Sequence, residues 1–202
     1  KFDQKLRDEP FAGIAIAGRH ICGEILHRKD STDKMRSGVS FEQIKRTIIE
    51  KVGSELATLK LILPEIEDVV GPISEILSQD YGQEGDYGAN RERLNATFRT
   101  FFRTVAAFCK PLVVVLDDIQ WADLPSINLM EVLMTDDSST NFMLVALYRS
   151  NEVNETHVVS KMMRSLDEKQ RNFDFDITRF EIENLTPTQI HVLLLNFFLL
   201  PS

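Results

Sequence analysis

Residues 111–123 read Pro-Leu-Val-Val-Val-Leu-Asp-Asp-Ile-Gln-Trp-Ala-Asp, so that an apolar run leads directly into two adjacent carboxylates. Consecutive valines in such a run predict a strand that is buried on both faces, as in a parallel sheet. Open α/β sheets bind ligands at the carboxyl ends of their strands, which is where Asp117 and Asp118 would lie. Two neighbouring acids at that edge repel each other unless a cation or a proton transfer uses them. The stretch therefore predicts a site for magnesium and a nucleotide.

The rest of the chain alternates between helical and strand patterns, which is typical of a parallel α/β sheet flanked by helices. Ser40 with Gln43 fits a helix-capping box, and Thr186 followed by Pro187 fits a helix start. The segments at 28–39 and 78–90 have the composition of loops, and a short helix fits within 64–77. We expect helices at residues 10–26, 40–63, 90–108, 124–134, 158–171 and from 186 onward, and strands at 111–116, 142–148 and 173–185.

Composition excludes several classes of protein. The 202 residues carry a net charge of -8, which argues against nucleic-acid or anionic-membrane binding as a general activity. No apolar run approaches the roughly 20 residues that span a bilayer. Cys22 and Cys109 lack metal-ligand spacing, and so do the four histidines. We expect two buried thiols in a reducing compartment, the cytoplasm, and histidines with structural roles.

The block from Asp117 to Asp123 resembles the second nucleotide-binding motif (Walker B) of P-loop NTPases. The resemblance is to the AAA-type ATPase modules related to the STAND signalling ATPases, which occur in large sensor kinases and some transcriptional regulators. Four other segments resemble the same family in the expected order. They correspond to a strand end at residues 1–4, the segment after it at 7–11, the sensor strand and its turn at 146–153, and the hinge into the helical lid at 182–187. The resemblance implies a partial P-loop core at residues 1–185, with a parallel sheet between two layers of helices, and the start of a helical lid at 186–202.

The resemblance also assigns roles to individual residues. Asp117 would face magnesium, directly or through water, and Asp118 would stand where related ATPases keep the catalytic acid. An aspartate there is one methylene shorter than the usual glutamate, so hydrolysis would be slow. Arg149 would be the sensor that contacts the γ-phosphate, and Gln120 would lie near the nucleotide. The alternatives are that the acids only cap the next segment, and that Arg149 is a surface residue at a strand end.

Two further residues of the motif have expected structural roles. Trp121 would pack against the core, and Asp123 would cap the following helix.

The sequence contains no Gly-x-x-x-x-Gly-Lys-[Ser/Thr], the loop whose amides and lysine hold nucleotide phosphates. In the family that loop precedes the segment that residues 1–4 resemble. We therefore expect an N-terminally truncated fragment that lacks the first strand, with a gap or abnormal pairing between the sensor strand and the last strand. Such a fragment would not hydrolyse ATP by itself.

These observations favour an ATP-binding and ATP-hydrolysing regulatory switch within a larger signalling protein, with ATP and Mg²⁺ as ligands. Its partners would be ATP and flanking domains such as a protein kinase domain, with no membrane. Two alternatives remain open. One is a catalytically inactive interaction scaffold with the same fold, and the other is a DNA-linked ATPase, which would need a basic face.

Overall fold

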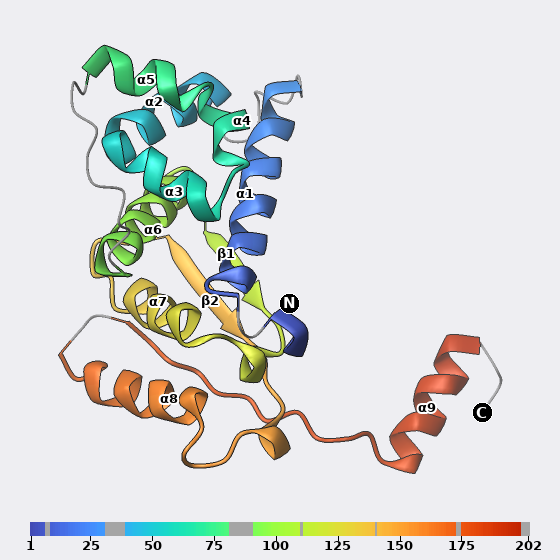
Figure 1. Ribbon diagram of the computed structural model, residues 1–202. Coiled ribbons are helices and arrows are strands. Elements are labelled where there is room, and N and C mark those ends of the chain that lie inside the picture. The colour runs from blue at the N-terminus through green and yellow to red at the C-terminus, as the bar shows by residue number, and fades with distance from the viewer. Residues whose placement is uncertain are drawn as a thin grey trace.

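The computed structural model describes residues 1–6, 9–30, 39–80, 91–109, 111–139, 141–172 and 175–198. Within these ranges, helices flank a sheet of two parallel strands, and the predicted α/β class is confirmed (Figure 1). The motif residues Arg7 and Asp8 and most of the predicted loops at 28–39 and 78–90 lie outside the described residues. Residues 28–30 and 78–80, which were expected to be loop, are helical because the preceding helices continue through them.

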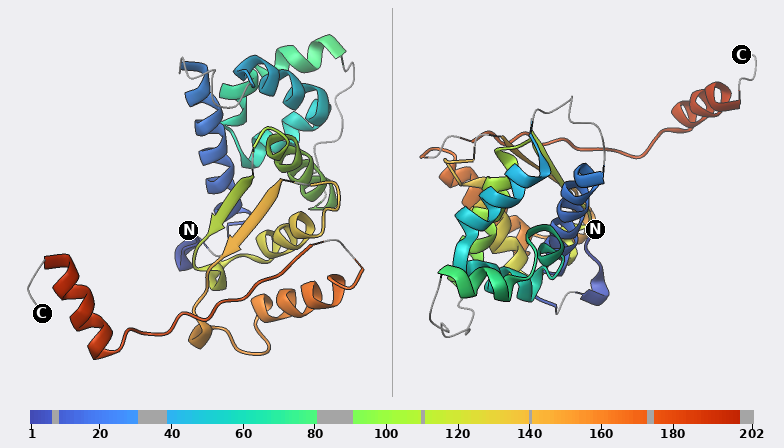
Figure 2. Two further views of the ribbon diagram at one scale, coloured as in Figure 1. Left: turned by 180° about the vertical axis from the view of Figure 1, so that it is seen from behind. Right: turned by 90° about the horizontal axis from the view of Figure 1, so that it is seen from above.

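The sheet consists of β1 (Leu112–Leu116) and β2 (Phe142–Ala146), paired in parallel with Leu112 opposite Phe142 and Leu116 opposite Ala146. The prediction that β1 is buried on both faces is wrong. Val114 is 6% exposed and points into the core, whereas Val115 is 58% exposed on the other face. The reason is that, among the described elements, helices pack closely on one face only; from behind, the two strands are in view over most of their length (Figure 2).

The α-helices largely follow the predicted segments, but two of these segments are divided. Where one short helix was expected within 64–77, two are observed, at Ile66–Val70 and Ile73–Asp80. The expected helix at 40–63 breaks at Gly53, whose φ of 55° lies in the region that favours glycine. The predicted cap is confirmed, because the Ser40 hydroxyl accepts a hydrogen bond from the Gln43 amide at 3.2 Å. The helices are α1 (Ala12–Asp30), α2 (Phe41–Val52), α3 (Leu56–Ile62), α4 (Ile66–Val70), α5 (Ile73–Asp80), α6 (Arg91–Ala106), α7 (Leu124–Met134), α8 (Val158–Lys169) and α9 (Pro187–Phe198).

The core forms where the aromatic face of α6 meets the sheet and the start of α1. Phe98 stacks on Phe11 with 5.7 Å between ring centroids, and Phe102 meets Phe142 of β2 edge to face at 6.1 Å. Phe98 and Phe102 are fully buried. Aromatic pairs of this kind each add about 0.5–1.5 kcal/mol beyond the area they bury. They fix the sheet against α6 and so position the strand ends.

The predicted strand at 173–185 is wrong. Residues 175–186 form no strand in the described structure, and Phe180 and Ile182 are 84% and 87% exposed. A β-strand needs a neighbouring strand to satisfy its backbone groups, and no described strand pairs with this segment. The segment instead begins against the core, where Phe175 and Ile177 are partly buried, and then runs outward as an extended arm that ends in α9, apart from the other helices (Figures 1 and 2).

The start of α9 is as predicted, because the Thr186 hydroxyl accepts a hydrogen bond from the Gln189 amide at 3.3 Å. None of the helices in the described part of the chain combines the length and apolar character needed to cross a membrane.

Candidate functional site

The two acids lie at the carboxyl end of β1, where the backbone is fixed from both sides. The Phe2 amide donates to the Asp117 carbonyl at 2.9 Å, and the Ile119 amide donates to the Leu147 carbonyl, just beyond β2, at 3.0 Å. Asp118 itself adopts the left-handed conformation, with φ 55° and ψ 44°. Such a conformation is uncommon outside glycine, although aspartate tolerates it better than most residues, and it clusters at functional sites. Here it turns the chain sharply away from the strand.

A single ammonium group bridges the two carboxylates. The Nζ atom of Lys1 lies 2.7 Å from Oδ2 of Asp118 and 3.2 Å from Oδ2 of Asp117. Asp118 is the more enclosed of the two, with 11% of its side chain exposed against 46% for Asp117. The hydrogen bond from Lys1, followed by that from Gln120, holds the pKa of the Asp118 carboxyl below its usual value. The hydrogen bonds that Lys1 donates to Asp118 and to Asp117 raise the pKa of its ammonium group.

Gln120 connects the acid pair to the turn after β2. Its side-chain nitrogen donates to Oδ1 of Asp118 and to Oε2 of Glu152, each at 3.1 Å. Its carbonyl oxygen accepts a longer hydrogen bond from the Arg149 amide, at 3.4 Å. Gln120 is only 2% exposed, so these contacts satisfy a buried amide that would otherwise be costly.

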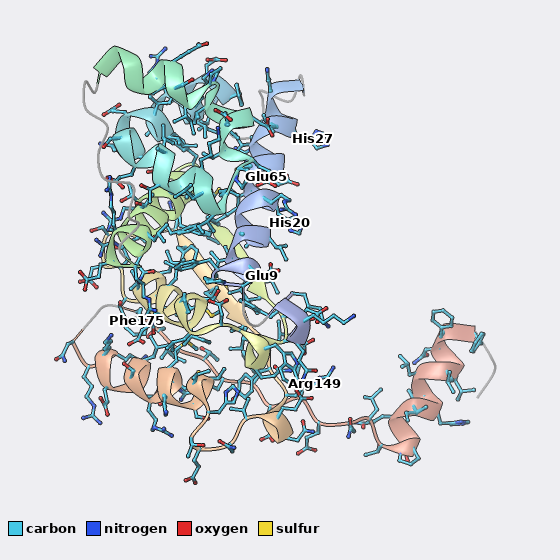
Figure 3. The ribbon with its side chains drawn as sticks, in the orientation of Figure 1. Glu9, His20, His27, Glu65, Arg149 and Phe175 are labelled. Atoms are coloured by element: carbon cyan, nitrogen blue, oxygen red, sulfur yellow. The ribbon has the colours of Figure 1, made fainter. Side chains whose placement is uncertain are left out.

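Arg149 follows β2 and reaches toward the same acid. Its Nε lies 3.6 Å from Oδ1 of Asp118, and its Nη1 donates to Oε1 of Glu152 at 3.1 Å. The side chain is 61% exposed and lies beyond the ends of the strands, at the start of the segment that leads to α8 (Figure 3). A guanidinium in this position is able to bind an incoming anion such as a phosphate.

The structural roles expected for the end of the motif are confirmed. Trp121 is partly buried and packs against the core. Asp123 is the N-cap of α7, where its carboxylate accepts hydrogen bonds from the Ser126 amide at 2.8 Å and the Ser126 hydroxyl at 2.6 Å.

The donor set of the acid pair suits a hard cation. Asp117 and Asp118 together already hold one positive charge, the Lys1 ammonium, between their oxygens. Within the described ranges, no group of three or more histidine, cysteine, aspartate or glutamate side chains is arranged as a metal cage. Magnesium commonly uses one or two carboxylates together with water and substrate phosphates, so two carboxylates are a fitting number for it.

The structure brings together all four side chains that the sequence singled out, namely Asp117, Asp118, Gln120 and Arg149. The residues that follow the two strands therefore lie close together, as predicted. Their catalytic and binding roles stay predictions. Sequence reasoning gave no role to two members of the cluster. Lys1 offered no signal of its own, whereas Glu152 could have been found from its position three residues after Arg149 in a turn.

Comparison with known proteins places this site in a family. The chain is 27% identical over 134 residues to the hybrid signal transduction histidine kinase G of Dictyostelium discoideum, a match that covers 66% of this chain and 4% of the relative. No solved structure matches the chain. The model of the AAA ATPase domain matches residues 15–145, which include Asp117, Asp118 and Gln120 but not Arg149. Because this match spans more than half of the 202 residues, the chain belongs to the AAA ATPase domain family.

Proposed function

We propose that this chain is the part of an ATP-binding regulatory switch that carries the Walker B and sensor elements. The observation that carries the proposal is the joint contact of Asp118 with Gln120 and Arg149 at the ends of two parallel strands, in a chain of the AAA ATPase family. In this proposal Asp117 binds magnesium directly or through water, and magnesium neutralises phosphate charge when it is bound. Asp118 orients and polarises a water molecule, and Arg149 contacts the γ-phosphate.

The proposal also includes the domains that flank the switch. The relative described above is named as a signal transduction histidine kinase, and the chain spans only 4% of its length. We propose that the module acts beside other domains, such as a kinase domain, in the cytoplasm. The arm at 175–186 would then be the hinge that leads into a helical lid beginning with α9.

Nucleotide binding by the full-length gene product tests this function. With Mg²⁺ present, ATP should bind measurably in calorimetry, and Asp117→Asn should weaken that binding at least several-fold because one carboxylate is lost. Asp137→Asn is the matched control, since Asp137 is an exposed aspartate in the loop after α7 and lies outside the cluster. If the wild type does not bind ATP, the switch is ruled out and the interaction scaffold becomes the better explanation.

A further inference from the structure

The buried Gln120 amide can adopt only one orientation. Its two N–H groups are used by Asp118 and Glu152, and its carbonyl oxygen faces the Arg149 amide. Turning the amide by 180° would direct its carbonyl oxygen at two carboxylates and its N–H groups at another N–H, which removes every one of these bonds. Glu152 is therefore one of the groups that fix Gln120, and it does so from a different segment of the chain.

The Glu152 carboxylate uses its two oxygens for different partners. Oε2 accepts from the buried Gln120, and Oε1 accepts from the exposed guanidinium of Arg149. The chain returns between Arg149 and Glu152 in a short 3-10 turn, closed by a hydrogen bond of 3.0 Å from the Glu152 amide to the Arg149 carbonyl. Only 26% of the Glu152 side chain is exposed. An enclosed carboxylate thus ties a long and otherwise flexible arginine to a rigid amide.

Arg149 has a competing partner in Asp118. Its Nε is 3.6 Å from Oδ1 of Asp118, whereas its Nη1 is 3.1 Å from Glu152, so the shorter contact is the one to Glu152. Charge-assisted hydrogen bonds of arginine to carboxylates are strong and directional. Without Glu152, the guanidinium would close on Asp118 and cover the acid that the proposed function assigns to the water.

We infer that Glu152 is a positioning residue, which holds the Arg149 guanidinium beside Asp118 and available to the γ-phosphate. The inference rests on the proposed function, because it takes the anion that Arg149 recognises to be that phosphate. Glu152 acts through Arg149 and Gln120, and it does not touch the nucleotide.

The test is the preference for ATP over ADP, measured as the ratio of their dissociation constants with Mg²⁺ in the full-length gene product. Arg149→Ala should lower this preference about tenfold, the effect of losing one charge-assisted contact. Glu152→Ala should lower it at least threefold, and the double variant should be no worse than Arg149→Ala alone. Glu152→Gln keeps the size of the side chain and should behave as Glu152→Ala does, so it carries the test if the alanine variant unfolds.

The matched control is Glu155→Gln, because Glu155 is an exposed glutamate three residues along the same segment and should leave the ratio unchanged. If Arg149→Ala loses the preference while both Glu152 variants keep it, the inference is overturned and the proposed function stands. Additive losses in the double variant would also overturn the inference, since Glu152 would then act independently of Arg149. If the wild type binds no ATP, or does not prefer it to ADP, the proposed sensing of the γ-phosphate fails and the inference fails with it.

Discussion

Oδ1 of Asp123 accepts a hydrogen bond of 3.1 Å from the backbone amide of Phe11, a residue 112 positions earlier in the chain. The same oxygen accepts from the Ser126 amide, so one carboxylate caps α7 and also holds the start of α1. Phe11 has a φ of 64°, an uncommon conformation for an aromatic residue, and it stacks on Phe98. The last residue of the motif is therefore a structural link between the first helix and the core.

Replacing Asp123 tests this link. Asp123→Ala should lower the free energy of unfolding of the 202-residue chain by about 2–4 kcal/mol, because a helix cap is lost and a buried amide is left without an acceptor. Asp123→Asn keeps an acceptor oxygen and should cost less than about half as much. Urea unfolding followed by circular dichroism measures both, with Asp137→Ala as an exposed control. Equal stability of Asp123→Ala and the wild type would contradict the link.

Two glycines in α1 should respond in opposite directions to alanine. A methyl group on Gly13 would overlap the ring of Phe2, whereas a methyl group on Gly23 would meet nothing within 4 Å. Gly23→Ala should therefore stabilise the chain by up to about 1 kcal/mol through helix propensity. Gly13→Ala should destabilise it by about 1–3 kcal/mol, because the buried Phe2 must move.

Thermal unfolding of the two glycine variants and the wild type measures these opposite changes in stability. If they shift the melting temperature in the same direction, the described packing of Phe2 on α1 is wrong.

The Lys1 contact should make stability depend on acid pH. The pKa of the Asp118 carboxyl is lower in the folded chain than its usual value of 3.8, with the Lys1 hydrogen bond as the main cause. The stabilisation is therefore complete above about pH 4 and is lost as the pH falls through the folded pKa. Lys1→Met should weaken this dependence, since Asp118 then titrates closer to its usual value.

Urea midpoints at pH 5 and pH 3 measure the effect of Lys1, and Lys5→Met, an exposed lysine of the same segment, is the control. In Lys1→Met, the hydrogen bond from Gln120 still lowers the pKa of Asp118, so part of the acid dependence of stability should remain. An acid dependence that is identical in Lys1→Met and the wild type would show that Lys1 does not hold Asp118 in solution.

The two faces of β1 should differ in their tolerance of a hydroxyl group. Val114→Thr introduces an unsatisfied hydroxyl into the core and should cost about 1–3 kcal/mol. Val115→Thr changes the exposed face and should alter stability by less than about 0.5 kcal/mol. Unfolding of the 202-residue chain in urea measures both variants, and a large loss for Val115→Thr would mean that this face is covered in solution.

The proximity of the candidate site residues could be predicted from the sequence because these residues follow the ends of two neighbouring strands. Asp117 and Asp118 come after one apolar run and Arg149 comes after the next, and parallel neighbouring strands place their carboxyl ends at one edge. The Asp123 cap was likewise predictable, because a cap acts within a few residues of the helix it begins. Glu152 was missed although it lies in the same turn as Arg149, because its contact with the buried Gln120 joins residues 32 positions apart, which local patterns do not encode.

The errors have a common physical source. Burial of both faces of β1 and the strand at 173–185 were inferred from apolar side chains, but burial and strand pairing depend on neighbouring elements. Val115 and Phe180 are both apolar and both exposed, because the described structure offers them no partner surface. The hydrophobic pattern therefore identified segments that are able to form buried strands, but it did not show whether neighbouring elements cover or pair with them.

The Lys1 contact also bears on the order of events during synthesis. The cluster joins residue 1 to residue 118 and extends to residue 149, so Lys1 leaves the ribosome long before its carboxylate partners. Contacts at such sequence separation form slowly because closing a long loop costs entropy. The helices between Ala12 and Ala106 can assemble while the chain is still growing. Lys1 can reach the acid pair once β1 has been made, but Arg149 can join it only after β2, so the cluster is complete only when the second strand has been synthesised.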